Sequence, residues 1–262
     1  MQFTRRSGGG TRRVGFRGMG VAANPPALIT SFDGMSATNH WAGAANGEPQ
    51  GSGTFTAAII FRLDAATAPA NEIWFGHGPN AGADGGWTIG VTAAGLLRGV
   101  VVNAVNTAIV TPTYSWVAGD VGKYHTVVLT HDGAVIKLYR NGVIVGTSTV
   151  CVGYAVPDVD IKTAIGCGYN GVGATVFGGT IVSYVGMAVS EGTALSAANV
   201  TTWHNDSKTL LDVADFAGPA QYRWQASDNV GLASPWTDDI GGITLTRVGT
   251  GGVLVQEVPT WA

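Results

Sequence analysis

Charged residues and cysteines are scarce in this chain of 262 residues, and their scarcity excludes several classes of protein. Only 12% of the residues are charged, and the two cysteines are Cys151 and Cys167. Two cysteines cannot build a disulfide framework, and no metal-type spacing of Cys and His is present. The sequence leaves open whether these thiols pair across neighbouring strands or stay free. Because no apolar run approaches the ~20 residues that cross a bilayer, and none follows the amino-terminal arginines, we expect no transmembrane segment, no signal peptide and no membrane partner.

Motifs for catalysis are also missing. Glycosidases use two carboxylates, and on one strand these must stand two or four positions apart to share a face. Glu72 lies in an expected strand without such a companion, so we interpret it as a solvated edge charge. His125 and His131 stand at the ends of another expected strand, and we assign them structural roles because nothing supplies a nucleophile or an orienting acid. The sequence therefore predicts a protein that is not an enzyme.

Glycine is abundant instead, with 40 residues, and it separates many short apolar runs. Runs of this kind, bounded by Gly, Asn, Asp or Pro, are typical of strands joined by turns. We expect strands at residues 28–32, 54–63, 72–76, 87–91, 96–102, 163–167, 180–189, 243–247 and 254–258. A helix is predicted for residues 197–204 behind an N-cap at Ser196, with a second short helical turn at 210–216.

The segment 124–148 carries the strongest strand signal. It contains three apolar-rich strands separated by Asp132-Gly133 and Asn141-Gly142. Both dipeptides favour the positive φ values of type I′ turns, which join the strands of hairpins. The apolar residues between the turns alternate with polar ones, so we expect one face of these strands to lie in the core.

Several short motifs follow one another in a characteristic order. They stand at residues 31–34 (SFDG), 53–56 (GTFT), 122–148, 177–181 (FGGTI) and 194–198 (ALSAA). In this order they resemble the laminin-G-like domains of the concanavalin A-like lectin and glucanase type, over about residues 28–207. The resemblance implies an all-β fold, a jelly-roll sandwich of two antiparallel sheets with one short helix in its carboxyl-terminal half.

The carboxyl-terminal segment 208–262 departs from the pattern of that family. A segment with the sequence features of residues 222–228, 236–242 and 245–246 commonly precedes the first motif, whereas here it comes last. Chain ends of compact domains often lie close together. We therefore expect this segment to complete the sandwich as permuted strands or to exchange with a neighbouring copy, and a truncated second domain is the alternative.

Residues 1–27 form an extended arm rich in Gly and Arg. Its positive charge comes from five arginines: Arg5, Arg6, Arg12, Arg13 and Arg17. The remainder of the chain holds the other nine of the 14 basic residues and all 17 acidic residues. Basic arms reach acidic neighbours, nucleic acids or anionic surfaces, and a disordered solubilising tail is the alternative. Because the body is acidic, we expect no nucleic-acid partner and interpret the arm as an anchor on another protein.

Two functions fit these features. The first is a virion structural protein, a bacteriophage capsid decoration or minor capsid protein at the capsid surface, bound to other capsid proteins as a homo-oligomer or a lattice-bound copy. The second is a lectin-like module that binds glycans through exposed aromatic rings, for which Trp74, Trp87 and Trp116 are candidates, although tryptophans in a sandwich are more often core. The family resemblance also permits calcium. Asp158 and Asp160 are its best local candidates, with solvated loop charges as the alternative, and no other cofactor is expected.

Overall fold

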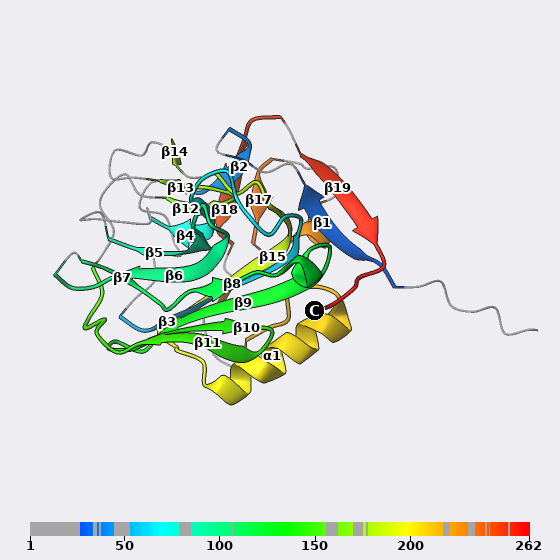
Figure 1. Ribbon diagram of the computed structural model, residues 1–262. Coiled ribbons are helices and arrows are strands. Elements are labelled where there is room, and N and C mark those ends of the chain that lie inside the picture. Colours follow the sequence, from blue (N-terminus) through cyan, green and yellow to red (C-terminus); the bar gives the residue numbers. More distant parts are fainter. Residues whose placement is uncertain are drawn as a thin grey trace, which may run out of the picture.

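Strands dominate the computed structural model, which describes residues 27–33, 36, 38–44, 53–78, 85–105, 107–155, 162–169, 175–176, 178–216, 221–229, 234–238, 240, 242–250 and 252–262. They form two large antiparallel sheets that pack face to face (Figure 1). One helix lies outside the sandwich, on the face of the first sheet that points away from the second.

The first sheet has eight strands. Seven of them run in the order β11 (Val143–Ser148), β10 (Ile136–Arg140), β9 (Tyr124–His131), β3 (Phe55–Leu63), β15 (Val182–Glu191), β1 (Ile29–Asp33) and β19 (Val253–Glu257). The eighth, β16 (Gln221–Gln225), pairs with the later half of β15, beyond the point where β1 pairs with it. The long strands β3, β9 and β15 make the centre of this sheet.

The second sheet has nine strands. Their order is β17 (Trp236–Thr237), β18 (Thr244–Val248), β2 (His40–Ala42), β12 (Thr163–Ile165), β4 (Glu72–His77), β5 (Trp87–Val91), β6 (Leu96–Val102) and β7 (Ala108–Val110), with β8 (Tyr114–Ser115) also on β6. A small pair, β13 (Gly168–Tyr169) and β14 (Thr175–Val176), and two 3-10 turns, η1 (Ala118–Asp120) and η2 (Ala226–Asp228), complete the described elements.

Alternation along the strands builds the main core between the sheets. In β9 and β10, Val127, Leu129, Ile136 and Leu138 are fully buried against the second sheet. Tyr139 points the other way and packs under the helix. The burial of these residues thus confirms the prediction, made from the two-residue period of the sequence, of which face of these strands lies in the core.

The helix α1 (Ala197–Leu210) covers the outer face of the first sheet. The Ser196 hydroxyl accepts a hydrogen bond from the backbone N–H of Asn199 at 3.2 Å, which confirms the expected N-cap. The helix runs six residues further than predicted and ends where Leu211 adopts a left-handed conformation, with φ 58°. The predicted second helical turn at 210–216 is wrong, because Leu211 reverses the chain and the residues after it bond to α1 and β16 instead.

The two predicted hairpin turns differ in the structure. Asn141 and Gly142 both have positive φ, at 50° and 79°, which confirms the type I′ turn between β10 and β11. Between β9 and β10 the loop is four residues long, and only Gly133 has positive φ. The type I′ prediction is wrong there, because the Asp132 side chain accepts the N–H of Val135 at 2.8 Å and closes a wider turn.

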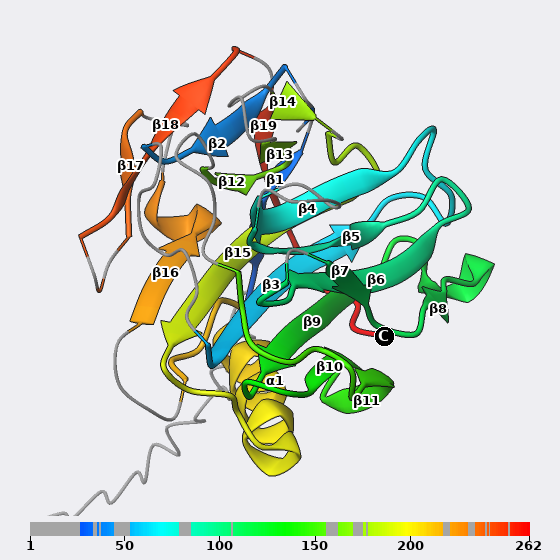
Figure 2. The same ribbon diagram turned by 90° about the vertical axis from the view of Figure 1, so that its left-hand side faces the viewer.

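The carboxyl-terminal segment supplies strands to both sheets of its own chain. β16 pairs with β15 and β19 with β1 in the first sheet, while β18 pairs with β2 in the second (Figures 1 and 2). Trp224, Trp236 and Leu245 from this segment are buried in the main core. Exchange of these strands with a neighbouring copy stays a prediction.

Candidate functional site

The three tryptophans proposed as glycan contacts lie in the core. Trp74 and Trp87 are fully buried and Trp116 is 7% exposed. The ring of Phe61 lies 4.7 Å from that of Trp74 and 6.0 Å from that of Trp116, centroid to centroid. A sugar needs an exposed ring face on which to stack, so this placement corrects the glycan role expected for these residues. Trp74 faces the core together with its neighbour Phe75 because the pairing of β4 with β5 shifts register between Ile73 and Phe75.

Glu72 is buried rather than solvated, which corrects its interpretation as an edge charge. Its carboxylate accepts hydrogen bonds from the indole N–H of Trp74 at 3.1 Å, from the hydroxyl of Thr180, and from the backbone N–H of Ile181 at 3.4 Å. Both oxygens are occupied by these structural donors. Glu72 therefore fixes the chain before β15 against β4 and is not placed to protonate or attack a glycosidic bond.

The histidines at the two ends of β9 are core residues. His125 packs against Phe61 and Trp116, and its Nε2 lies 3.0 Å from the carbonyl oxygen of Asp120. Burial lowers the pKa of His125 to about 4, and burial also lowers the pKa of His131. Both rings are therefore neutral near pH 7, and among the described residues neither has a hydrogen bond to a nucleophile that it could activate.

The described residues include no group of three or more His, Cys, Asp or Glu side chains arranged to hold a metal ion. Cys151 and Cys167 are free and buried, and burial raises the pKa of Cys151 to about 11, which makes it an unreactive thiol. The calcium candidates Asp158 and Asp160 and the five arm arginines Arg5, Arg6, Arg12, Arg13 and Arg17 lie outside the described residues, so their roles stay predictions. In the part of the chain that the structure describes, no helix has the length and hydropathy of a membrane span.

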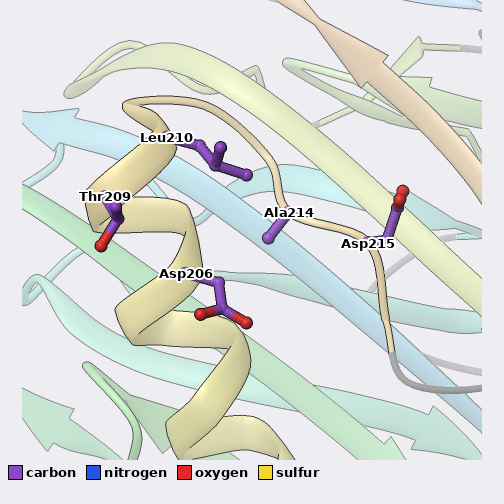
Figure 3. A pocket seen from close by; sticks show the side chains of 5 residues that line it. All are labelled: Asp206, Thr209, Leu210, Ala214 and Asp215. Atoms are coloured by element: carbon purple, nitrogen blue, oxygen red, sulfur yellow. The ribbon is translucent and has the colours of Figure 1, made fainter.

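A hollow of about 270 Å³ opens beside the last turns of α1. Asp206, Thr209 and Leu210 line it from the helix, and Ala214 and Asp215 line it from the chain that follows (Figure 3). In Figure 3, Leu210 points from the helix toward the segment that carries Ala214, and the Asp206 carboxylate lies beside the helix one turn earlier. The hollow exists because the left-handed residue after α1 turns the chain back along the helix.

Hydrogen bonds hold both walls of the hollow in place. The indole N–H of Trp203 donates to the carbonyl oxygen of Ala214 at 2.8 Å, and the N–H of Ala214 donates to the Ser207 hydroxyl at 3.1 Å. Arg223 of β16 donates to the carbonyl oxygen of Val213 at 3.3 Å. The segment opposite the helix is thus tied to α1 and to the first sheet, so the hollow is a preformed feature.

The groups that line the hollow are acceptors beside an apolar side chain. Within the described residues, the Asp206 carboxylate makes no hydrogen bond or ion pair. The Thr209 hydroxyl donates to the carbonyl oxygen of Asn205 at 2.9 Å, which leaves its oxygen free to accept. Asp215 pairs with Arg223 at 2.6 Å, and Leu210 is 63% exposed. Such a surface suits a ligand with several hydroxyl donors and an apolar C–H face.

This site was not predicted, because the expected helix ends at residue 204, before Asp206 and Leu210. Asp206 and Leu210 stand four positions apart and therefore share one face of the helix. The opposite wall could not be foreseen, because residues 210–216 read as a helical turn rather than as a returning chain.

The carboxyl of Asp212, which follows α1, has an unusual pKa. Burial raises it to about 6 and the nearby Asp228 carboxylate adds to the shift, whereas hydrogen bonds from the Ser227 hydroxyl and the Val213 N–H oppose it. The folded pKa lies above the usual value of 3.8, so the folded state holds this proton more tightly than the unfolded chain. Asp212 therefore reduces stability progressively as the pH rises from about 4 to about 6.

We expect the substitution Asp212→Asn to raise the free energy of unfolding by about 1 kcal/mol at pH 7. The pKa shift alone implies a larger gain in the free energy of unfolding, but solvent screens the charge of this half-buried residue. At pH 4 the two proteins should differ little, because Asp212 is then mostly protonated in the folded state. Urea unfolding at both pH values measures the effect, with Asp206→Asn as the exposed control. An equal gain at pH 4 and pH 7 would exclude titration of Asp212 as its cause.

Comparison with known proteins gives a family model and a set of related folds. The model of the concanavalin A-like lectin/glucanases superfamily matches residues 36–201. No curated protein sequence matches the chain.

Among solved structures, a Bacteroides ovatus protein to which carbohydrate binding is attributed has a TM-score of 0.64 at 14% identity, over 91% of this chain and 63% of its own. This chain is thus clearly shorter than that relative. A second structure is the carbohydrate-binding module CBM40 of the Ruminococcus gnavus IT-sialidase, with a TM-score of 0.45 at 19% identity over 65% of this chain and 95% of its own. A third is the heptameric SAP-like pentraxin of Limulus polyphemus, with a TM-score of 0.46 at 16% identity over 70% of this chain and 84% of its own. At these identities the likeness is one of fold.

Proposed function

The chain belongs to the concanavalin A-like lectin/glucanases superfamily, and from that premise we propose that it binds carbohydrate without hydrolysing it. Lectins and glucanases share this fold, so the choice between them depends on the site and not on the architecture. The fold shared with the Bacteroides ovatus protein supports a binding role, although that protein extends well beyond this chain.

The surroundings of Glu72 argue against hydrolysis. A glycosidase needs one carboxylic acid to protonate the leaving oxygen and a second carboxylate to act as base or nucleophile, both open to the substrate. Glu72 is buried, and its oxygens accept from Trp74, Thr180 and Ile181. Releasing it to a substrate would leave those donors without an acceptor inside the protein.

The hollow beside α1 is the observation that carries the proposal. Its free Asp206 carboxylate and the Thr209 oxygen can accept hydrogen bonds from adjacent sugar hydroxyls, and the exposed Leu210 side chain can contact the C–H face of the ring. The charge of Asp215 is offset by Arg223, so Asp206 supplies the uncompensated negative charge of the hollow. An unpaired carboxylate repels an acidic ligand, so neutral or amino sugars fit this site best.

The test is a glycan array of neutral and amino sugars, followed by calorimetric titration of the best ligand. We expect Asp206→Asn to weaken binding about tenfold or more, because a hydrogen bond to a charged acceptor is among the stronger polar contacts. Asn205→Ala is the matched control, since Asn205 is exposed on the same turn but does not line the hollow. Equal affinities of Asp206→Asn and the unsubstituted chain would place the sugar elsewhere.

The capsid-decoration role is not favoured by any described residue. Its main support is the basic arm, which lies outside the described part of the chain. Anchoring by the arm is compatible with carbohydrate binding by the sandwich, and it stays a prediction.

A further inference from the structure

A second hollow, of about 230 Å³, opens at the edge of the first sheet where β1 and β19 lie side by side (Figure 1). The strand pair lines one side of it and η2 lines the other, with the residues Thr30, Leu254, Gln256, Ala226 and Ser227. Thr30 pairs with Gln256 across the strands, and two positions along Phe32 pairs with Leu254. Because Phe32 belongs to the main core, this face of β1 and β19 is the inner face of the sheet, whereas α1 covers the outer face.

Solvent reaches the second hollow, and its walls are fixed. Ser227 and Gln256 are exposed, and Thr30 and Leu254 are half-buried. Ala226 is the buried member of the lining and belongs to the main core. Antiparallel pairing holds β1 against β19, and the Ser227 hydroxyl donates to the Asp212 carboxylate, which ties η2 to the chain after α1. A ligand therefore meets a preformed and accessible site.

The two walls of the second hollow offer different hydrogen-bonding groups. The Gln256 amide donates to the Thr30 hydroxyl at 3.2 Å. Neither side chain makes another hydrogen bond in the described part of the chain, so the Thr30 proton and the second amide N–H are free to donate to a ligand. On the opposite wall, the Ser227 hydroxyl spends its proton on Asp212, which leaves its oxygen free to accept. The strand wall thus supplies donors and the η2 wall supplies an acceptor.

An N-acetyl group has the complementary arrangement. In its planar amide the N–H and the C=O point in opposite directions, and a methyl group stands beside them. The C=O can accept from Thr30 or Gln256 while the N–H donates to Ser227, and the methyl group can contact Leu254. We propose that the second hollow binds the acetamido group of an N-acetylated sugar. This inference rests on the proposed carbohydrate-binding function and adds a second site with its own ligand class.

Size and charge favour this ligand over other sugars. Pockets for drug-sized ligands hold about 300–1,000 Å³, so the second hollow suits one substituent rather than a longer segment of glycan. Asp212 and Asp228 both accept from the Ser227 hydroxyl, and neither forms an ion pair within the described residues. Their charge repels an acidic sugar. A plain hydroxyl in place of the acetamido group would lose the methyl contact and one of the two walls.

The experiment compares the methyl glycosides of N-acetylglucosamine and N-acetylgalactosamine with those of glucose and galactose, by NMR titration at pH 7.5. Each N-acetylated sugar differs from its parent hexose at one carbon. We expect at least one N-acetylated sugar to bind about tenfold more tightly than its parent, because it makes an additional hydrogen bond and an apolar contact. The backbone amide signals of residues 226–228 and 254–256 should shift during that titration.

Variants of the two walls test the assignment. Thr30→Val combined with Gln256→Met removes the donors of the strand wall and keeps its bulk, and Ser227→Ala removes the acceptor of the η2 wall. Each should reduce the preference to about twofold or less. Thr30→Ser is the matched control, because it keeps the hydroxyl and should keep the preference. Melting temperatures near that of the unsubstituted chain will show that these variants fold, as expected for side chains that are exposed or half-buried.

Equal binding of each N-acetylated sugar and its parent hexose would overturn the inference, and so would a preference that survives both variants. Asp206→Asn separates this inference from the proposed function. It should weaken hexose binding at the hollow beside α1 and leave the preference for the N-acetylated sugar in place. If no sugar binds the unsubstituted chain, the proposed function itself fails.

Discussion

A chain that ends at residue 216 is expected to lose cooperative folding, although the family model ends earlier, at residue 201. The deletion removes β16, β17, β18 and β19, and with them Trp224, Trp236 and Leu245 from the main core. Trp236 alone lies 5.0 Å from Phe32 and 5.3 Å from Trp41, measured between ring centroids. Removing one large buried side chain costs about 3–5 kcal/mol, and the total stability of a domain is about 5–15 kcal/mol. Three such losses exceed what the remaining core can support.

Near-ultraviolet circular dichroism and urea unfolding of the shortened chain measure this effect. We expect no fixed aromatic signal and no sigmoidal transition. Adding the fragment 217–262 should restore both if the segment fills its slot as separate strands. If the chain that ends at residue 216 unfolds cooperatively with the stability of the whole chain, the carboxyl-terminal strands are dispensable and do not complete the sandwich.

The substitution Glu72→Ala is expected to lower the free energy of unfolding by about 3 kcal/mol or more. It leaves the indole N–H of Trp74 and the Ile181 N–H without an acceptor inside the protein, and each buried donor of this kind costs about 1–3 kcal/mol, whereas Thr180 is exposed and can donate to water. Glu72→Gln keeps one oxygen but turns an NH₂ group toward these donors. We therefore expect it to cost about 1–3 kcal/mol, less than alanine does.

Urea unfolding at pH 7 gives these values, with Asp215→Ala as the control. Asp215 also forms an ion pair, but its side chain is 69% exposed, so its loss should cost less than about 1 kcal/mol. If Glu72→Ala costs no more than Asp215→Ala, the carboxylate does not fix the chain before β15, and the argument against a catalytic role loses its main support.

Local patterns in the sequence predicted most of the strands and the start of the helix, because alternation, turn residues and the helix N-cap all act over a few positions. The arrangement of the strands in a two-sheet antiparallel jelly roll of concanavalin A-like type was implied by the resemblance to laminin-G-like domains, and it is confirmed. The strands β5 and β6 have the bounds that the sequence predicted. The carboxyl-terminal end of α1 was less predictable, since its last turns are held by the returning chain, where the N–H of Ala214 donates to the Ser207 hydroxyl.

The chemistry of individual side chains depended on contacts that the sequence does not display. The sequence suggested a solvated Glu72, because its hydroxyl donor, Thr180, stands 108 positions away. Trp74 could be placed in the core only once the irregularity in β4 was known. The second hollow likewise depends on the pairing of Thr30 with Gln256, which stand 226 positions apart. The candidate binding surfaces of this chain could therefore not be predicted from its sequence motifs.

Calorimetric titration of the 262-residue chain with its best array ligand, with reducing ends counted in the same sample, tests the central claim most directly. Binding without hydrolysis predicts a saturable heat, about tenfold weaker affinity in Asp206→Asn, and no increase in reducing ends over hours. The absence of any saturable heat, or a steady release of reducing ends, would contradict the account.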